Sequence, residues 1–413
     1  MQNDWIEAVN HILCLLFFLC YSYQFLYIPI AHWKKKAVAA PKKLHRYAVL
    51  ICARNEERVL PNLIESIHRQ DYPKDLLHIF VAADNCTDHT AAVARTCGAT
   101  VYERFDTRFI GKGYALEFLL NHIEKDFPDA FDGFFVFDAD NLLKSDYISR
   151  MNETFSNGND IVTSYRNSKN YADNWISAGY GLWFLRESVY LNRARENLGA
   201  SCSVSGTGFL FSKEVLQKCS GWNFHLLTED IEFSAHNIVQ GRRIAFCTEA
   251  ELYDEQPITF SQSWRQRLRW AKGYLQVFRK YGTKLIFGIF RGSFSCFDLC
   301  MNIMPAFLLS LAALVCNGIH LILCMLAGVP PLSALWSLLQ VLFGGSLILF
   351  FLGLLTTITQ WKHIRAKWWQ KILYTFTFPI FMLTYLPISL QALFCRVQWK
   401  PIAHTSKKKI EDM

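Results

Sequence analysis

The chain has 413 residues, of which 52% are hydrophobic and 15% aromatic, and its formal net charge is +8. This length suits two or three structural units, and the apolar content argues against a purely soluble enzyme and favours an association with membrane. The mild basic excess is compatible with nucleic acid, anionic lipid or phosphorylated substrates, so its distribution along the chain decides between them.

The first predicted element is a nearly continuous apolar stretch at residues 12–30, followed by three lysines at 34–36. The stretch is long enough to span a bilayer, and the lysines should lie in the cytosol. Asp4 and Glu7 precede it, whereas a signal peptide would begin with basic residues. We therefore expect an uncleaved N-terminal membrane anchor.

The following segment alternates between strand-like and helix-like patterns. Apolar runs bounded by turn residues predict strands, and apolar residues spaced three and four apart predict helices. This βαβαβ alternation is typical of a doubly wound α/β sheet. The predicted strands are 47–53, 77–83, 99–102 and 134–137, and the predicted helices are 57–69, 88–96, 113–123, 174–195 and 231–239.

Polar and acidic residues follow three of the predicted strands: Asn55 and Glu56, then Asp84, then Asp138 and Asp140. In open α/β sheets the ligand lies beyond the carboxyl ends of the strands. Carboxylate oxygens spaced as in Asp138 and Asp140 suit Mg²⁺ or Mn²⁺. An isolated Asp-x-Asp is more often an ordinary acidic turn, but three polar strand ends in a row favour a nucleotide site.

Residues 260–291 are both basic and aromatic. This composition suits a helix at the membrane surface, although nucleic-acid binding is the competing interpretation. Two apolar stretches downstream, 303–327 and 335–358, are each long enough to span a bilayer. They favour the membrane interpretation, so we expect no nucleic-acid partner.

The last apolar stretch, residues 372–394, contains two prolines and lies between a basic loop at 361–371 and a basic tail. A full span here would place the tail outside the cell, against the preference of positive charge for the cytosol. The stretch is therefore either a broken, re-entrant or interfacial element, or a full span with an external tail.

Five short segments stand in a characteristic order along the chain. The chain resembles the membrane-embedded family-2 glycosyltransferases, the group containing hyaluronan, chitin, cellulose and poly-N-acetylglucosamine synthases. The fifth segment matches the Gln-x-x-Arg-Trp signature of processive members. The segments are Ala53-Arg54-Asn55-Glu56-Glu57, Asp84-Asn85-Cys86-Thr87-Asp88, Asp138-Ala139-Asp140, Thr228-Glu229-Asp230 and Gln266-Arg267-Leu268-Arg269-Trp270.

The resemblance implies a GT-A-like catalytic domain of mixed or parallel sheet on the cytosolic face of a multi-pass cell-membrane protein. The implied units are an anchor at 1–36, a catalytic domain at 37–257, basic interfacial helices at 258–300, membrane helices at 301–396 and a basic tail at 397–413.

The resemblance also implies a UDP-sugar donor and Mg²⁺ or Mn²⁺ as cofactor. Asp140, with Asp138, would hold the metal ion, and Asp138 has an alternative role beside the ribose. Asp84 would contact the base, and Arg269 the diphosphate. The implied donor-binding residues are Asn55, Glu56, Asp84, Lys112, Asp138 and Arg269, where Lys112 is nearly as plausible as a plain surface lysine.

For the acceptor, the resemblance implies direct displacement with inversion, in which Asp230 is the general base. Trp270 would offer a flat face to a sugar ring, and Gln266 would hydrogen-bond the diphosphate or the acceptor. Glu229 is expected to be structural, and Trp264 to be an interfacial anchor.

The chain departs from the family pattern around the base. Arg54 stands where many relatives have an aromatic residue that stacks on the base, and Cys52 stands in place of a proline. The base pocket is therefore built differently. That the donor base is uracil, as in a uridine nucleotide, is implied only by the resemblance to the family.

Three functions remain for comparison. The first is transfer from a UDP-sugar onto a growing cell-surface polysaccharide. The second is transfer of a single sugar onto a lipid. The third is a membrane scaffold with a decayed transferase fold, against which the retained acids Asp84, Asp138, Asp140 and Asp230 argue.

Overall fold

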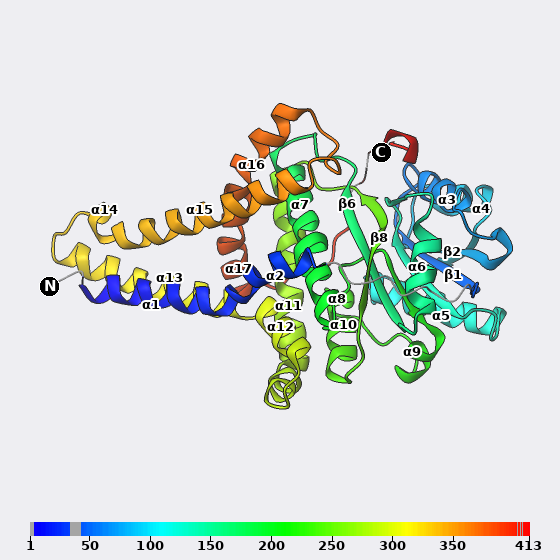
Figure 1. Cartoon of the computed structure of the whole chain (residues 1–413), viewed down its shortest axis with the longest axis horizontal. Helices are drawn as coiled ribbons and strands as arrows, with labels where there is room; N and C mark the ends of the chain where they lie inside the picture. The colour runs from blue at the N-terminus through cyan, green and yellow to red at the C-terminus, as the bar shows by residue number, and fades with distance from the viewer. Residues whose placement is uncertain (1–3, 34–42, 403, 405, 407) are drawn as a thin grey trace.

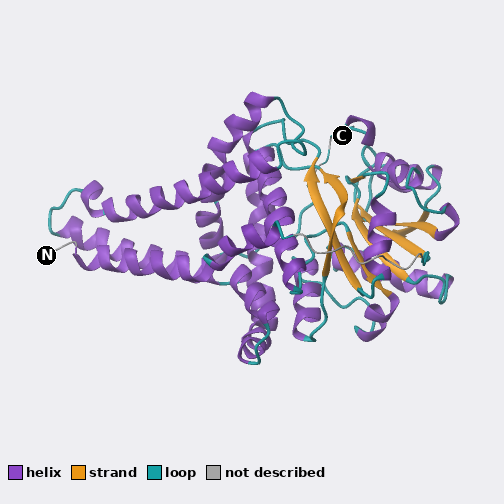
Figure 2. Cartoon of the chain, in the orientation of Figure 1, coloured by secondary structure: helices purple, strands orange, loops and turns teal. Residues whose placement is uncertain are grey.

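The computed structural model describes residues 4–33, 43–402, 404, 406 and 408–413. They form a body built around one β-sheet and an arm of long helices that projects from the body (Figure 2). The sheet lies in the part of the body away from the arm, so the polar and apolar parts of the molecule are separated.

The sheet has eight strands in the order β3-β2-β1-β4-β7-β6-β8-β5. β1 pairs in parallel with β2 and β4, whereas β7 runs antiparallel to both β4 and β6. The expected doubly wound mixed sheet is therefore confirmed. The strands are β1 (Tyr47–Ala53), β2 (Leu77–Asp84), β3 (Thr100–Arg104), β4 (Gly133–Asp138), β5 (Leu142–Leu143), β6 (Ile161–Ser168), β7 (Phe209–Ser212) and β8 (Ala245–Asp254).

Helices cover both faces of the sheet. In β1, Val49 and Ile51 pack toward α3, α4 and α6, whereas Leu50 packs toward α5 and α7. Because both faces are buried, the central strands are continuous apolar runs. The helices of the body are α3 (Leu60–His68), α4 (Thr90–Thr96), α5 (Lys112–Asp126), α6 (Tyr147–Ser156), α7 (Trp175–Arg186), α8 (Arg193–Leu198), α9 (Lys213–Lys218) and α10 (Glu229–Val239), with short turns η1 (Lys74–Leu76) and η2 (Glu187–Asn192).

The body differs from the sequence-based expectation in several elements. Strands β5, β6 and β8 and helices α6 and α9 were not predicted. The single helix expected over 174–195 is divided into α7, the π-helical turn η2 and α8. β6 lacks the apolar pattern of a buried strand because it contains polar residues. Arg166 donates to Asp254 and Asn167 donates to Glu251, so these buried polar groups are satisfied by the neighbouring strand β8.

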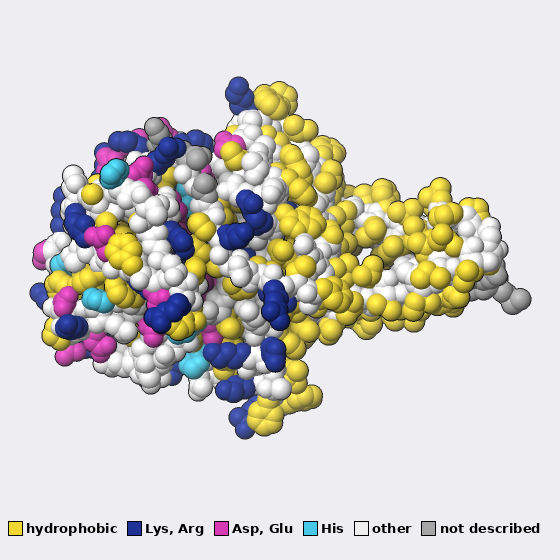
Figure 3. Space-filling view, turned by 180° about the vertical axis from the view of Figure 1, so that it is seen from behind, with side chains coloured by type: hydrophobic (Ala, Val, Ile, Leu, Met, Phe, Trp, Pro, Cys, Tyr) yellow, Lys and Arg dark blue, Asp and Glu magenta, His cyan; other side chains and the backbone are white. Residues whose placement is uncertain are grey.

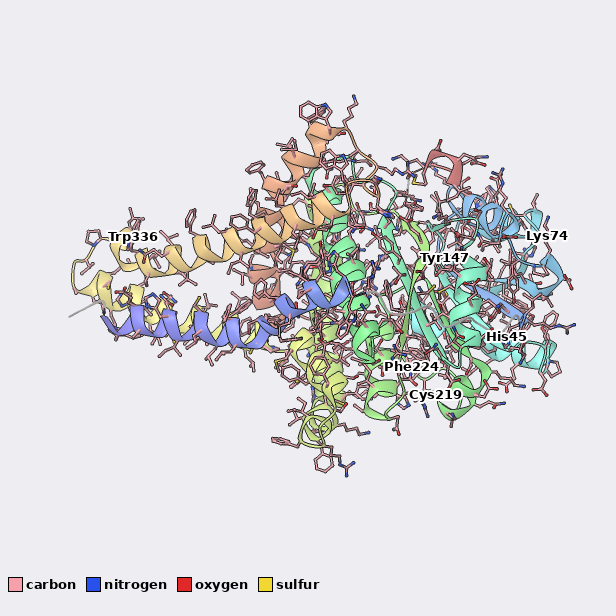
Figure 4. The ribbon with its side chains drawn as sticks, in the orientation of Figure 1. His45, Lys74, Tyr147, Cys219, Phe224 and Trp336 are labelled. Carbon is pink, nitrogen blue, oxygen red and sulfur yellow. The ribbon has the colours of Figure 1, made fainter. Side chains whose placement is uncertain are left out.

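Four helical segments of the described chain are long and apolar enough to cross a membrane: Trp5–Ala31, Phe294–Leu326, Trp336–Thr359 and Trp368–Phe394. α1, α13 and α15 form the projecting arm, and Trp336 marks its far end (Figures 1 and 4). The helices outside the body are α1 (Asp4–Tyr21), α2 (Tyr23–Ala31), α11 (Phe260–Phe290), α12 (Phe294–Ile303), α13 (Pro305–Leu326), α14 (Pro331–Ala334), α15 (Trp336–Thr359), α16 (Trp368–Leu383) and α17 (Tyr385–Phe394).

One buried carboxylate ties the N-terminal anchor to the body. Asp298 of α12 accepts hydrogen bonds from the hydroxyls of Tyr23 and Tyr27 at 2.8 and 2.9 Å, and from Arg195 Nε at 2.7 Å. A buried ion pair is favourable only when its remaining lone pairs are satisfied, as they are here. The anchor therefore has a fixed position against α8 and α12.

The apolar segment with two prolines is broken, because α16 ends at Leu383 and α17 begins at Tyr385. α16 packs on α15 of the arm and on α7, and α17 packs on α11 and on α13 of the arm. The tail beyond α17 then returns to the body, where the turn η3 (Ile410–Asp412) lies beside α3 (Figure 1). This course favours a broken element over a full span with the tail on the opposite side.

Gly113 fixes how closely α5 approaches the loop before α10. A Cβ added to Gly113 would lie 2.0 Å from the carbonyl oxygen of Phe224. We expect Gly113→Ala to destabilise the protein by about 2 kcal/mol, because the backbone cannot move aside as a side chain can. Thermal unfolding in detergent measures this, and Gly318→Ala, where a Cβ meets nothing within 4 Å, is the control that should change little.

Candidate active site

One cavity of about 1470 Å³ opens at the carboxyl ends of β1, β2 and β4. It brings together most of the residues that the sequence singled out: Glu56, Asp84, Lys112, Asp138, Asp140, Asp230, Gln266, Arg269 and Trp270. Asn55 does not line it. Its side chain instead accepts a hydrogen bond from Thr87 N at 2.8 Å and holds two loops together.

Lys112 lies at the first turn of α5 and points into the cavity. Its Nζ donates to a carboxylate oxygen of Asp138 and, at 2.8 Å, to the carbonyl oxygen of Gly206. Because its side chain is only 14% exposed, Lys112 is not a plain surface lysine. It places a positive charge between the strand end of β4 and the loop before β7.

Asp140 is held rigidly and is 4% exposed. Its Oδ2 accepts from Glu255 N at 2.6 Å, and Lys169 Nζ donates to its backbone carbonyl at 2.7 Å. Burial opposes ionisation, but the positive charges of His404 and Lys169 outweigh it and lower the pKa of Asp140. Asp140 therefore presents an ionised carboxylate to the cavity.

Asp84, at the end of β2, is paired with Arg104 of β3. The distance between Arg104 Nη1 and Asp84 Oδ1 is 2.6 Å, and both side chains are buried. Burial raises the pKa of Asp84, and the guanidinium of Arg104 opposes this rise. The pair fixes the direction of the Asp84 carboxylate at the edge of the cavity.

Glu229 and Asp230 form the first turn of α10. Burial raises the pKa of both carboxyl groups, and Lys112 and Arg269 partly offset the rise. A carboxylate whose pKa is raised toward neutrality is suited to accept a proton during a reaction. Both residues line the cavity, so Glu229, which was expected to be structural, is exposed to the same space as Asp230.

The Gln-x-x-Arg-Trp segment lies on α11 and is divided between two faces of the helix. Gln266, Arg269 and Trp270 face the cavity. Arg267 is fully buried on another face, where its Nη1 donates to Thr384 Oγ1 at 2.6 Å and to the carbonyl of Phe381 at 3.1 Å. Arg267 thus binds backbone and side-chain oxygens at the break between α16 and α17.

Trp264 lies outside the cavity. Its indole Nε1 donates to Gln391 Oε1 of α17 at 2.7 Å. This contact joins α11 to α17, and the expected role of Trp264 as an interfacial anchor stays a prediction.

The C-terminal tail reaches the same cavity, which the sequence did not indicate. Trp399, Lys400 and His404 line it, and Trp399 stacks under the guanidinium of Arg54 at 5.5 Å. His404 Nδ1 lies 2.8 Å from Glu56 Oε1. Its pKa is raised to about 10 because Asp140 and Glu56 outweigh the opposing effect of burial. No motif or spacing near the tail could have revealed this, because 348 residues separate His404 from Glu56.

Residues 45–273, more than half of the chain, match the family described as "Glycosyltransferase like family 2". The chain is a family-2 glycosyltransferase. This family-2 enzyme is 26% identical over 290 residues to the "Probable glycosyltransferase YdaM" of Bacillus subtilis (strain 168), covering 62% of the chain and 63% of that relative.

A second relative is the "Beta-monoglucosyldiacylglycerol synthase" of Synechocystis sp. (strain ATCC 27184 / PCC 6803 / Kazusa). It is 25% identical over 239 residues, which cover 56% of the chain and 48% of the synthase. The matches therefore span about half to two thirds of the length of these curated relatives.

Among solved structures, the enzyme is similar to the mannosyltransferase PcManGT from Pyrobaculum calidifontis. The TM-score is 0.61 at 17% identity, and the match covers 94% of this chain and 99% of that one. This likeness confirms the expected GT-A-like fold of the glycosyltransferase, with apolar helices attached.

Proposed function

We propose that the enzyme is an inverting, metal-dependent glycosyltransferase that moves a sugar from a UDP-sugar to an acceptor hydroxyl. One observation carries the proposal. The strand-end acids Asp138 and Asp140 and the helix-start acid Asp230 open onto one cavity, together with the cations Lys112 and Arg269. The cations can bind the diphosphate of the donor, and a carboxylate can accept the proton of an acceptor hydroxyl.

Asp230 acts as the general base. The acceptor oxygen attacks the anomeric carbon, its proton passes to the Asp230 carboxylate, and the bond between that carbon and the phosphate oxygen breaks to release UDP. Arg269 stabilises the charge on the leaving diphosphate through the two donors of its planar fork. Gln266 and Trp270 orient the reacting sugars, because both face the cavity from α11.

Asp140 and Asp138 would hold a divalent ion. Within the described residues, no group of three or more His, Cys, Asp and Glu side chains converges as a complete metal site. Two carboxylates still fit Mg²⁺, which is commonly bound by one or two carboxylates with substrate phosphates and water. When bound, such an ion neutralises the phosphates. The structure of the Pyrobaculum mannosyltransferase is a complex with GDP-mannose and Mn²⁺.

The enzyme would be a multi-pass protein of the cell membrane with its body in the cytosol. The basic loop at 361–371 and the tail support this orientation, because positive charge is retained on the cytosolic side. The proposed units are the anchor at 1–36, the catalytic domain at 37–257, the basic helices at 258–300, the membrane helices at 301–396 and the tail at 397–413. Reporter fusions at residues 365 and 410 should both report the cytosol.

Two classes of acceptor meet these requirements, a growing cell-surface polysaccharide and a membrane lipid. Purified enzyme should release UDP from one of UDP-glucose, UDP-N-acetylglucosamine, UDP-galactose or UDP-glucuronate, and chelation of divalent ions should stop the release. Mg²⁺ or Mn²⁺ should restore it. Release that persists in chelator would contradict the metal assignment, and release from none of the donors would contradict the UDP-sugar assignment.

A further inference from the structure

The cavity that holds Asp230 does not end at the reaction centre. It continues past Trp270 and Tyr385 into the space between α1, α13 and α15. Its volume of about 1470 Å³ exceeds the roughly 300–1,000 Å³ typical of small-molecule sites. The space-filling view shows the apolar arm hollowed near its junction with the body (Figure 3). The cavity therefore has room for a long second substrate beside the donor.

The walls of this extension are mainly aliphatic. They are formed by residues such as Leu309, Ala313, Leu338, Val341, Gly344 and Leu349. Asn317 of α13 lines it too, but it already exchanges hydrogen bonds with Asn10 at 2.7 and 3.0 Å. The other polar lining residues of α1, α13 and α15 are Glu7, His11, Ser310 and Gln340.

Such walls discriminate between the two acceptor classes. A sugar polymer has hydroxyl groups on every ring, so most of them would lack partners along the aliphatic walls, at a cost of about 1–3 kcal/mol each. An acyl chain instead gains about 0.8 kcal/mol for each buried methylene group when it leaves water. The extension therefore suits hydrocarbon.

A guanidinium stands in the same cavity where α7 meets the N-terminal anchor. Arg186 donates to Gln24 Oε1 of α2 at 2.9 Å, and its guanidinium lies 5.4 Å from the ring of Trp183. No carboxylate of the described residues lies within 4 Å of it. The adjacent Glu187 is beyond that distance and accepts from Ser205 Oγ at 3.4 Å.

Arg186 remains a cation in this position. Burial and the neighbouring Arg195 lower its pKa to about 10, so it is charged at neutral pH. Arg186 is half-buried, and the charge of Glu187 offsets the fall in its pKa only in part. A partly buried charge without a directly paired carboxylate is unfavourable. The side chain is thus suited to an anionic group of a ligand, and a planar guanidinium binds phosphate oxygens well.

We propose that the acceptor is a membrane phospholipid with a free hydroxyl group, whose acyl chains occupy the cavity between α13 and α15 and whose phosphate binds Arg186. The proposal rests on the proposed transfer to an acceptor hydroxyl at Asp230. It selects the lipid over the polysaccharide, and it assigns the arm a role as the binding site for the acceptor chains.

The test uses the full chain in phosphatidylcholine vesicles with a UDP-sugar that supports UDP release. Adding phosphatidylglycerol should stimulate UDP release and give a lipid product one sugar heavier by mass spectrometry. A ladder of water-soluble sugars would overturn the proposal. Equal use of diacylglycerol would overturn the phosphate contact. If UDP binding itself fails, the proposed function fails and not only this choice of acceptor.

Two variants test the site itself. Gly345→Leu adds bulk where a Cβ meets nothing within 4 Å, so it should fill the cavity without displacing a neighbour and raise the KM for the lipid. Arg186→Gln should raise the KM for phosphatidylglycerol about tenfold, as expected for the loss of a charge-assisted hydrogen bond.

Matched controls lie on the same or adjoining helices outside the cavity. Leu347→Phe on α15 and Arg193→Gln on α8 should leave the KM for the lipid unchanged. Affinity for UDP, measured for every variant, reports whether the donor site is folded. Unchanged lipid KM values in both Gly345→Leu and Arg186→Gln would overturn the proposal.

Discussion

Asp230→Asn should reduce kcat about a thousandfold while affinity for UDP is retained. A positioned general base contributes roughly 10²–10⁴ to a rate, and the amide cannot accept the proton of the acceptor hydroxyl. The substitution preserves the size of the side chain, so the first turn of α10 should keep its structure. Turnover of a UDP-sugar and UDP binding by calorimetry measure the two effects separately.

The same assignment predicts the pH dependence. Burial raises the pKa of Asp230 above the ordinary value of an aspartate. Below that pKa the carboxyl carries a proton and cannot take another, so kcat/KM should fall as the pH falls. This decline should occur at a higher pH than an exposed aspartate would give.

The control for the base assignment is Asp75→Asn. Asp75 lies exposed in η1, and its substitution removes a carboxylate of the same kind from the body without touching the cavity. Activity and pH profile should then match the unmodified enzyme. Undiminished turnover in Asp230→Asn would show that Asp230 is not the general base. If turnover is lost in Glu229→Gln but not in Asp230→Asn, Glu229 would be the general base instead.

The central part of the fold could be predicted because its strands have strong local signals. The run Phe134-Phe135-Val136-Phe137 lies on β4, with acids following at the strand end as expected. β6 was missed because its buried polar residues find partners on β8, which lies about 80 residues further along the chain. Such partners are visible only in three dimensions, so the periodicity of β6 carried no strand signal.

The helix that carries the Gln-x-x-Arg-Trp segment shows a second limit of sequence patterns. Arg267 and Arg269 are two positions apart, and successive residues of an α-helix are turned by about 100°. The two side chains therefore point in nearly opposite directions. Arg267 supports the break between α16 and α17, and Arg269 alone reaches the cavity. Composition predicts a basic helix but does not assign these separate tasks.

The acceptor was the part of the function that motifs described least. Asp138 and Asp230 lie within the residues that match the family, and their proposed roles concern the donor and the transferred proton, so they identify the chemistry and not the second substrate. The information lies in aliphatic residues of the arm, whose sequence is indistinguishable from that of an ordinary membrane span. Only the cavity between α13 and α15 supports the proposed lipid-binding role of the arm over the role of a simple anchor.

Removal of residues 397–413 should lower kcat/KM for the donor at least about a hundredfold. The tail places Trp399 against Arg54, at the motif position where relatives have an aromatic residue, and it brings Lys400 and His404 into the cavity. Losing two charge-assisted contacts of about 1.5–3 kcal/mol each accounts for this magnitude. Steady-state kinetics with varied donor concentration measure it.

A shorter deletion tests whether the effect comes from the tail residues that line the cavity or from the end of the tail, which attaches it to α3. Residues 409–413 contact α3 through the ion pairs Lys409–Glu65 and Arg69–Glu411, all of them substantially exposed. Exposed ion pairs contribute about 0–1 kcal/mol, so deleting only these residues should change kcat/KM less than about fivefold. His404→Ala in the full chain should reproduce part of the large effect, because Asp140 loses the charge that lowers its pKa. Faster turnover after removal of 397–413 would instead show that the tail blocks the donor site. The sign of the change in kcat/KM therefore decides whether the tail helps to bind the donor or inhibits its binding.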